Sequence, residues 1–277
     1  MFKDKVNQLF GNQLTEWEQA KNNYRALEQV KVKTQEVNGL PYVVQFNPMR
    51  FTSSAAIHDC KSIRERPCFL CAANRSAEQK GIPFKDNYTL LINPYPIFPR
   101  HFTIPSNIHV PQRIASRFGD MLDLAQALDE HVVFYNGPKS GASAPDHFHF
   151  QAGNKGFLPI ENYRDWKNAI RFESEDKQQM INRFDAIYDS LPIPPDHDEP
   201  MMNIIAWYGA GQWTTYVFPR KKHRPDCFFA EGDANLIVTP GAVDLGGVLI
   251  TPLEKDFEKI TATMIADVLN EVCEIQL

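Results

Sequence analysis

The segment Asp146-His147-Phe148-His149-Phe150-Gln151 alternates polar and aromatic side chains. In a β-strand, successive side chains point to opposite faces of the sheet. The two histidines and the glutamine would therefore share one face, and the two phenylalanines would share the other. The aromatic face needs a core to cover it, whereas the polar face is left for a ligand. The alternation predicts a strand that carries a site on one side.

Two neutral imidazoles and an amide on one face offer a nucleophile, an orienting or metal-binding group, and a neutral hydrogen-bond donor. A lone histidine is more often a satisfied structural residue. Three such groups at every second position favour function instead. We therefore interpret residues 147–151 as an active-site strand.

The composition of the chain narrows the class of protein. Its 277 residues include 43% hydrophobic residues and 19 Phe, which is enough for a substantial core. The net charge of −5 argues against a general nucleic-acid binder. We find no secretory signal and no apolar run long enough to cross a membrane. Five Cys, two of them in a Cys-x-x-Cys, do not resemble a disulfide framework. A cytoplasmic enzyme fits these features best.

The hydrophobic patterns predict a mixture of helices and strands. Strands are expected at 41–46, 88–92, 101–104, 131–135, 147–151, 235–238 and 247–250. Helices are expected at 13–30, 112–130 and 254–273, and in part of 161–189, with a Pro-rich linker at 192–195. Residues 88–109 and 202–223 align without a gap, and each reads as two strands followed by Pro-x-x-x-His. The alignment indicates a duplication whose second copy lacks the His-x-His pattern.

Several motifs together resemble the histidine-triad (HIT-like) superfamily. A glutamine at the third position of His-x-His-x-Gln is similar to the branch that contains galactose-1-phosphate uridylyltransferase, diadenosine tetraphosphate phosphorylase and GDP-hexose phosphorylase. The stretch 147–152 is most similar to the GDP-hexose phosphorylases. The segments that carry the resemblance are Val44–Arg50, Asn93–Ile97, Phe102–Pro105, His109, Val132–Gly137 and His147–Gln151.

The resemblance implies an α+β protein built from two tandem, unequal HIT-like units with antiparallel sheets and flanking helices. We expect residues 1–190 to form the catalytic unit, which includes the N-terminal helix. Residues 191–277 would form a degenerate second unit packed on the first.

The same resemblance implies that His149 is the nucleophile and carries a nucleoside monophosphate (NMP) during the reaction. An imidazole that attacks phosphorus must be neutral, with its second nitrogen held by an acceptor. Gln151 can donate an N–H to a phosphate oxygen but cannot transfer a proton. It therefore favours transfer to a phosphate acceptor over hydrolysis. His147 would support this pair.

Four further residues are candidates for nucleotide or phosphate contacts. Asn136 ends a strand, and Ser143 lies in the small-residue loop 137–144, where backbone N–H groups can approach a phosphate. Arg50 and Arg220 resemble arginines of the family, and a guanidinium can bind an oxyanion through two hydrogen bonds. Each of the four also has an ordinary structural interpretation.

Cys68 and Cys71 have the spacing of half a zinc site. The resemblance to the uridylyltransferases supplies His109 and His147 as the other two ligands. Zinc would then be structural and would hold the active-site strand. Two buried apolar cysteines, or a local set with His58 and Cys60, are the alternatives, and the GDP-hexose phosphorylase pattern does not require a zinc.

The sequence leaves three functions open. The first is a nucleotidyltransferase or phosphorylase that acts at the α-phosphate of a nucleoside diphosphate-sugar, with a slight preference for GDP, or of a dinucleotide polyphosphate. The second is a HIT-like hydrolase with water as the acceptor. The third is a non-catalytic, zinc-stabilised nucleotide-binding module. The final acceptor and the oligomeric state are not determined by these patterns.

Overall fold

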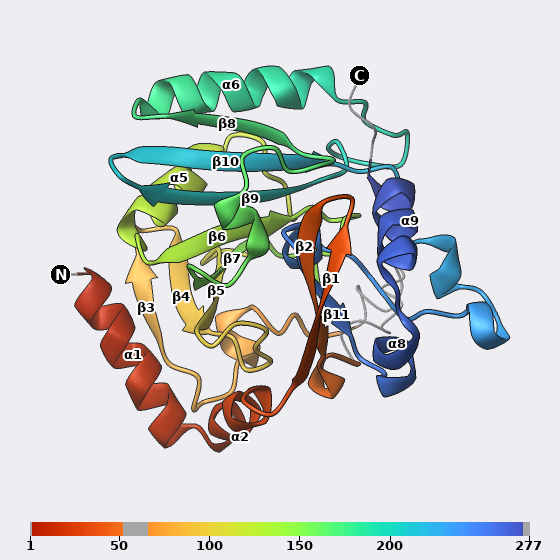
Figure 1. Ribbon diagram of the computed structural model, residues 1–277. Helices are drawn as coiled ribbons and strands as arrows, with labels where there is room; N and C mark the ends of the chain where they lie inside the picture. Colours follow the sequence, from red (N-terminus) through yellow and green to blue (C-terminus); the bar gives the residue numbers. More distant parts are fainter. Residues whose placement is uncertain (1, 52–65, 274–277) are drawn as a thin grey trace.

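The computed structural model describes residues 2–51 and 66–273 (Figure 1). One large sheet organises the fold, with the strand order β3-β4-β5-β7-β6-β9-β10-β8 and antiparallel pairing throughout. Its strands are β3 (Gly81–Phe84), β4 (Tyr88–Ile92), β5 (His101–Pro105), β6 (His131–Asn136), β7 (His149–Asn154), β8 (Ile170–Ser174), β9 (Met202–Gly209) and β10 (Gln212–Pro219). The predicted active-site strand, residues 147–151, corresponds to β7, which lies between β5 and β6. It begins two residues later than predicted, so His147 and Phe148 precede it.

A second, smaller sheet joins the beginning of the chain to its C-terminal part. It contains β1 (Lys31–Val37), β2 (Leu40–Phe46) and β11 (Val248–Thr251). Asn38 and Gly39 both have positive φ angles, of 53° and 82°, which is typical of the tight turn that joins two antiparallel strands. β11 then pairs with β2 in parallel. Strand β1 was missed in the sequence, because its alternation is largely exposed.

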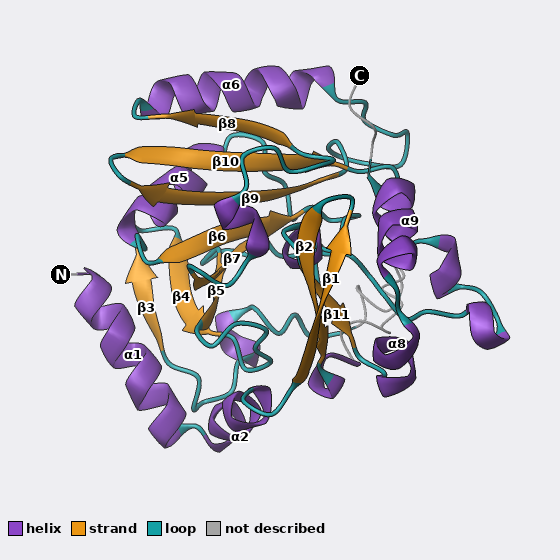
Figure 2. Cartoon of the chain, viewed as in Figure 1, coloured by secondary structure: helices purple, strands orange, loops and turns teal. Residues whose placement is uncertain are grey.

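Helices cover both sheets and are drawn in purple in Figure 2. Their bounds are α1 (Phe2–Glu16), α2 (Glu18–Leu27), α5 (Phe118–Ala127), α6 (Lys177–Ser190), α7 (Ala242–Leu245), α8 (Glu254–Lys259) and α9 (Ala262–Val272). Asp176 caps α6 by accepting hydrogen bonds from the backbone N–H groups of Gln178 and Gln179. α8 and α9 lie against the small sheet, whereas α6 runs along β8 at the edge of the large one.

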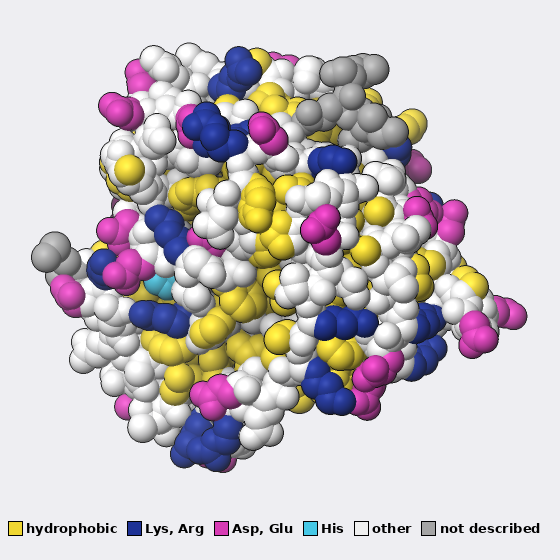
Figure 3. Space-filling view, in the orientation of Figure 1, with side chains coloured by type: hydrophobic (Ala, Val, Ile, Leu, Met, Phe, Trp, Pro, Cys, Tyr) yellow, Lys and Arg dark blue, Asp and Glu magenta, His cyan; other side chains and the backbone are white. Residues whose placement is uncertain are grey.

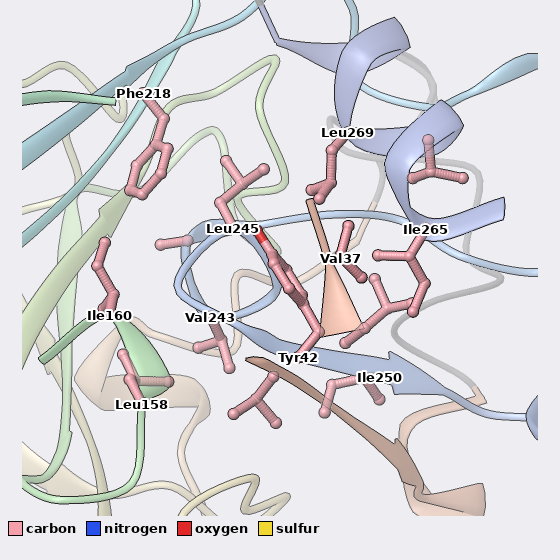
Figure 4. Close-up of a cluster of buried hydrophobic side chains, with 14 of the residues drawn as sticks. Val37, Tyr42, Leu158, Ile160, Phe218, Val243, Leu245, Ile250, Ile265 and Leu269 are labelled. Carbon is pink, nitrogen blue, oxygen red and sulfur yellow. The ribbon is translucent and has the colours of Figure 1, made fainter. Parts of the chain in front are cut away.

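The two largest hydrophobic cores of the described residues lie on opposite faces of the large sheet. Phe148 and Phe150 belong to the core that α1, α5 and α6 cover, so the aromatic face of the active-site strand is buried as expected. The second core lies between the large sheet and the small one, and Figure 4 shows part of it. β7 contributes Gly153 here, because a Cβ at this position would lie 2.3 Å from atoms of the Phe98 ring.

The two hairpins that align in sequence occupy one continuous sheet. β4 and β5 form the first pair, β9 and β10 form the second, and β7 and β6 lie between them. The division of the chain into units at residue 190 stays a prediction. An α+β protein with flanking helices is confirmed, and its strands pair antiparallel except for β2 with β11.

Several local predictions of secondary structure were wrong. The N-terminal helix 13–30 is two helices, α1 and α2, which are separated at Trp17. The C-terminal helix 254–273 is likewise divided into α8 and α9. Residues 235–238 are not a strand, because the N–H of Ile237 donates to the Asp256 carboxylate rather than to a neighbouring strand. No helix among the described residues is long and apolar enough to cross a membrane.

Candidate functional site

The backbone fixes the tautomer of His149. This residue is the first of β7 and its side chain is buried, with 2% exposed. Its Nδ1 lies 2.9 Å from the backbone oxygen of His147, and a carbonyl only accepts, so Nδ1 carries the proton. Nε2 is left with its lone pair. Burial lowers the pKa of His149 to about 4, so the ring is neutral at physiological pH.

Gln112 holds the backbone around His149 and was not identified from the sequence. Its Oε1 accepts the N–H of His149 at 2.7 Å, and its Nε2 donates to the backbone oxygens of His149 and Asn136, each at 3.0 Å. The side chain is fully buried. One amide therefore satisfies backbone groups of both β6 and β7 where the two strands approach the site. The sequence placed Gln112 in a helix, but α5 begins at Phe118.

His101 fixes the orientation of Gln151. The Nδ1 of His101 accepts the N–H of Ile97 at 3.1 Å, so the proton of the neutral ring is on Nε2. That Nε2 lies 3.0 Å from Oε1 of Gln151 and donates to it. The NH₂ group of Gln151 is then the part of the amide that remains for a ligand. Burial lowers the pKa of His101 to about 3, which keeps this hydrogen bond in its neutral form.

Cys68, Cys71, His109 and His147 meet at the start of the active-site strand, and their ligand atoms all lie within 4.8 Å of one another. The Nδ1 of His147 is 3.3 Å from Cys68 Sγ and 3.5 Å from Cys71 Sγ, and the Nδ1 of His109 is 3.2 Å from Cys71 Sγ. A tetrahedral zinc ion with ordinary bond lengths separates sulfur and nitrogen ligands by roughly 3.6 Å. The four residues therefore form a group that could bind a metal ion.

The surroundings of this group also fit a metal. Nε2 of His147 lies 2.9 Å from the backbone oxygen of Ser106, so it carries the proton and leaves Nδ1 as the ligand atom. Asp146 pairs with Arg66 at 2.7 Å, and its other oxygen lies 3.8 Å from Nε2 of His109. The alternative ligands His58 and Cys60 lie outside the described residues.

A cavity of about 570 Å³ opens in front of His149 and Gln151. A volume of this size is typical of a site for a nucleotide-sized molecule. Among the residues predicted to bind nucleotide or phosphate, Arg50, Asn136 and Ser143 line this cavity. Asn136 also has a structural role, because its Oδ1 accepts from the Nδ2 of Asn203 at 2.7 Å and from the N–H of Ala242 at 2.8 Å.

Arg220 does not reach this cavity. It is 4% exposed, and its guanidinium donates to the side chain of Asn203 and to the backbone oxygens of Val272, Pro240, Lys222 and His223. These five acceptors use all of its N–H groups. Arg220 therefore holds the backbone of residues 222–223 through hydrogen bonds.

Several apolar side chains are exposed on the surface. Figure 3 shows apolar side chains in a band across the middle of one face, with most of the Lys, Arg, Asp and Glu around it. Tyr95, Phe69 and Met49 line the cavity although each is more than 40% exposed. Such exposed apolar groups are suited to contact a flat ring such as a nucleobase.

The comparisons with known proteins give a family for the chain and show the fold that it shares with solved structures. Residues 9–154 match the family model described as "Domain of unknown function (DUF4922)". The chain belongs to the DUF4922 family. No curated protein matches this DUF4922 chain in sequence.

Solved structures of yeast Ap4A phosphorylase Apa2 share the fold of this DUF4922 protein. One is 15% identical with a TM-score of 0.63, and the match covers 94% of this chain and 97% of that chain. Apa2 in complex with Ap4A is also 15% identical with a TM-score of 0.63, and the match covers 99% of this chain and 98% of that chain. Apa2 in complex with AMP is 16% identical with a TM-score of 0.57, and the match covers 94% of this chain and 96% of that chain. These matches confirm the HIT-like fold expected from the sequence.

Proposed function

We propose that this protein is a nucleotidyltransferase that forms a covalent His149-NMP intermediate. The observation that carries the proposal is the fixed tautomer of His149. With the proton on Nδ1 held by the carbonyl of His147, the Nε2 lone pair is the nucleophile. No proton has to be removed before attack.

The reaction follows as two displacements at one phosphorus atom. Nε2 of His149 attacks the α-phosphorus of the substrate, the P–N bond forms, and the bond to the leaving phosphate oxygen breaks. An acceptor oxygen then attacks the same phosphorus, the P–N bond breaks, and Nε2 regains its lone pair. The positive charge on the substituted ring is stabilised by the carbonyl that accepts from Nδ1.

Gln151 would stabilise the charge that develops on the phosphate. Its NH₂ group donates to a non-bridging oxygen, and an amide does so without losing a proton. Backbone N–H groups of the loop 137–144 and the side chains of Arg50, Asn136 and Ser143 would contribute further contacts to the nucleotide. The absence of an acid at position 151 favours a phosphate acceptor over water.

The substrate class is a nucleotide in which the α-phosphate is bonded to a further phosphate. The similarity in fold to Ap4A phosphorylase supports a dinucleotide polyphosphate. The His-x-His-x-Gln-Ala stretch instead favours a GDP-sugar slightly. Both substrates share the bond that the proposed reaction breaks.

We further propose that Cys68, Cys71, His109 and His147 bind a structural zinc ion. The ion would tie the Cys-x-x-Cys loop to the residue two positions before the nucleophile and so fix the carbonyl that orients His149. All four protein ligands are supplied, which is typical of a structural site rather than a catalytic one.

Intact mass spectrometry tests the central proposal. The protein is incubated with diadenosine tetraphosphate and with GDP-, ADP- and UDP-sugars in the absence of an acceptor. We expect an acid-labile NMP adduct whose mass names the base and which His149→Ala abolishes. The variant His131→Phe is the matched control, because His131 is buried but does not line the cavity.

Other outcomes separate the alternatives. Turnover that does not depend on an added phosphate acceptor would identify a hydrolase. A third outcome is that nucleotides bind, no adduct forms, and His149→Ala changes no rate. That outcome would overturn the covalent mechanism and identify a binding module.

A further inference from the structure

The segment that joins α6 to β9 places a carboxylate in the core behind the active-site strand. Residues 191–201 run between these two elements and contain the predicted Pro-rich linker 192–195 (Figure 1). Glu199 lies near the end of this segment, is 1% exposed and does not line the cavity. One of its oxygens accepts the hydroxyl of Tyr135, and the other accepts the backbone N–H of Ile114 at 2.8 Å.

The first partner of this carboxylate belongs to the segment Val110–Ile114, which supports the active-site strand. The N–H of Phe148 donates to the backbone oxygen of Val110 at 2.7 Å. The N–H and the carbonyl of His149 are both bonded to the side chain of Gln112. The segment therefore lies between the active-site residues and the carboxylate, and it is hydrogen-bonded to both.

The second partner, Tyr135, contacts the aromatic face of the same stretch. Its ring stacks on that of Phe148, with 6.0 Å between the ring centroids and 28° between the ring planes. Phe148 directly precedes His149 in the chain. Glu199 is thus connected to the backbone of His149 by two routes, through the segment Val110–Ile114 and through the ring of Phe148.

Burial makes the charge of this carboxylate depend on pH near neutrality. Transfer of a carboxylate out of water is unfavourable, so burial raises the pKa of Glu199 to about 7. Burial also raises the pKa of Tyr135, whose hydroxyl therefore remains a donor. The other titratable or charged side chains around Glu199 are Tyr188 and Asp189 from α6, Arg113 from the segment before α5, and Asp198, which pairs with Arg113.

The two forms of Glu199 cannot hold the same hydrogen bonds. The ionised carboxylate accepts from both donors. A proton on one oxygen would face the N–H of Ile114, and a proton on the other oxygen would displace the hydroxyl proton of Tyr135. Protonation therefore removes one of the two hydrogen bonds. A glutamine at this position has a single accepting oxygen and reproduces that state at every pH.

We propose that Glu199 is a positioning residue for His149. Its ionised carboxylate holds the segment Val110–Ile114 and Tyr135 against the active-site strand, and so fixes the backbone from which the nucleophile projects. The inference rests on the proposed function, in which Nε2 of His149 is aligned with a phosphorus atom. Because Glu199 does not line the cavity, it acts on the rate of attack rather than on the affinity for the nucleotide.

The pH dependence of adduct formation tests this role. Glu199→Gln and the unmodified protein are compared in single-turnover reactions over about pH 5.5–8.5, where burial keeps His149 neutral. The rate of the unmodified protein should rise with pH by about tenfold, which corresponds to one buried hydrogen bond to a charged group, with a midpoint near 7. Glu199→Gln should show the lower rate at every pH, and the two proteins should converge below about pH 6. The affinity for the nucleotide should stay within about twofold.

Asp256→Asn is the matched control. Asp256 is a buried carboxylate that accepts the backbone N–H of Ile237 and does not line the cavity. This variant should keep the rate and the pH profile of the unmodified protein. The double variant Tyr135→Phe/Glu199→Gln should lose little more than Glu199→Gln alone, because both changes act on the same hydrogen bond.

Hydrogen exchange gives a readout that does not depend on catalysis. At a single pH, Glu199→Gln should exchange the N–H of His149 about tenfold faster, whereas the N–H of the buried Val217 in β10 should change by less than about twofold. A general loss of stability would instead raise both rates. If no adduct forms in the unmodified protein, the proposed function fails, and the exchange of the His149 N–H still tests the positioning role.

Three results would overturn the inference. Glu199→Gln could keep the rate and the pH profile of the unmodified protein. Its hydrogen exchange could rise equally at His149 and Val217. Asp256→Asn could flatten the pH profile as much as Glu199→Gln does.

Discussion

The hydrogen bond from His101 to Gln151 predicts how two substitutions at one position should differ. A glutamine at position 101 can place its amide nitrogen where Nε2 of the histidine lies, and so can still donate to Gln151. An asparagine is shorter and reaches only the place of Nδ1. We therefore expect His101→Gln to keep the orientation of the Gln151 amide and His101→Asn to release it.

The size of the effect follows from what the released amide loses. One hydrogen bond of about 1–1.5 kcal/mol holds the orientation, and its loss allows the NH₂ group to turn away from the phosphate. Each 1.36 kcal/mol in the barrier is tenfold in rate, so His101→Asn should slow formation of the His149-NMP adduct by about tenfold. Gln151→Ala removes the donor itself and sets the upper limit, about a hundredfold.

Single-turnover kinetics of adduct formation are the assay, with substrate affinity measured separately. The rate of His101→Gln should stay within about threefold of the unmodified protein, and the affinity of all variants should change little. In the double variant His101→Asn/Gln151→Ala, the first change should add almost nothing to the second. Nitrogen NMR of the imidazole should also show His101 protonated at Nε2.

Two results would refute this reasoning. Equal losses in His101→Gln and His101→Asn would mean that position 101 acts through packing alone. Fully additive losses in the double variant would mean that the histidine does not act through Gln151.

Three further predictions concern stability. We expect about one zinc ion per chain by elemental analysis, and Cys68→Ser should lose the metal and lower the melting temperature by several degrees, because a four-ligand site contributes directly to folding. Gln112→Leu should lower the free energy of unfolding by about 2–4 kcal/mol in denaturant titration, because it leaves the buried N–H of His149 without its acceptor; an unchanged midpoint would contradict this. Burial lowers the pKa of His131 from 6.5 to about 4, so the unfolded state binds the proton first and stability is lost as the pH falls from 6.5 to 4. The variant His131→Phe should therefore lose up to about 3 kcal/mol less than the unmodified protein over that range, and parallel stability curves would be inconsistent with this assignment.

The sequence predicted the parts of the site that depend on residues close together in the chain. Alternation along 147–151 is a local pattern, and it separated the aromatic face from the polar face correctly. His101 and Gln112 were missed because their roles depend on pairing across the fold. His101 pairs with Gly153 in the sheet, so its side chain lies diagonally opposite Gln151, which is 50 residues away in the chain.

The resemblance was informative to a different degree at each residue. It brought His109 and His147 to Cys68 and Cys71, which the structure places together. It also indicated Arg220 as a phosphate contact, although this arginine is buried and its N–H groups are all used. The sequence shows that an arginine lies after a strand, but not whether its side chain reaches the cavity or the interior of the protein. Arg220 is buried and does not line the cavity.

The parallel pairing of β2 with β11 has a consequence for how the protein is synthesised. The hydroxyl of Thr251 donates to the backbone oxygen of Gln45, which lies 206 residues earlier in the chain. A chain leaving the ribosome presents its N-terminal part first, so β2 spends most of translation without this neighbour. The wall of the cavity that carries Asp244 is also synthesised only after His149. A prematurely terminated chain would therefore contain His149 and still lack the part of the cavity wall that residues 239–244 form.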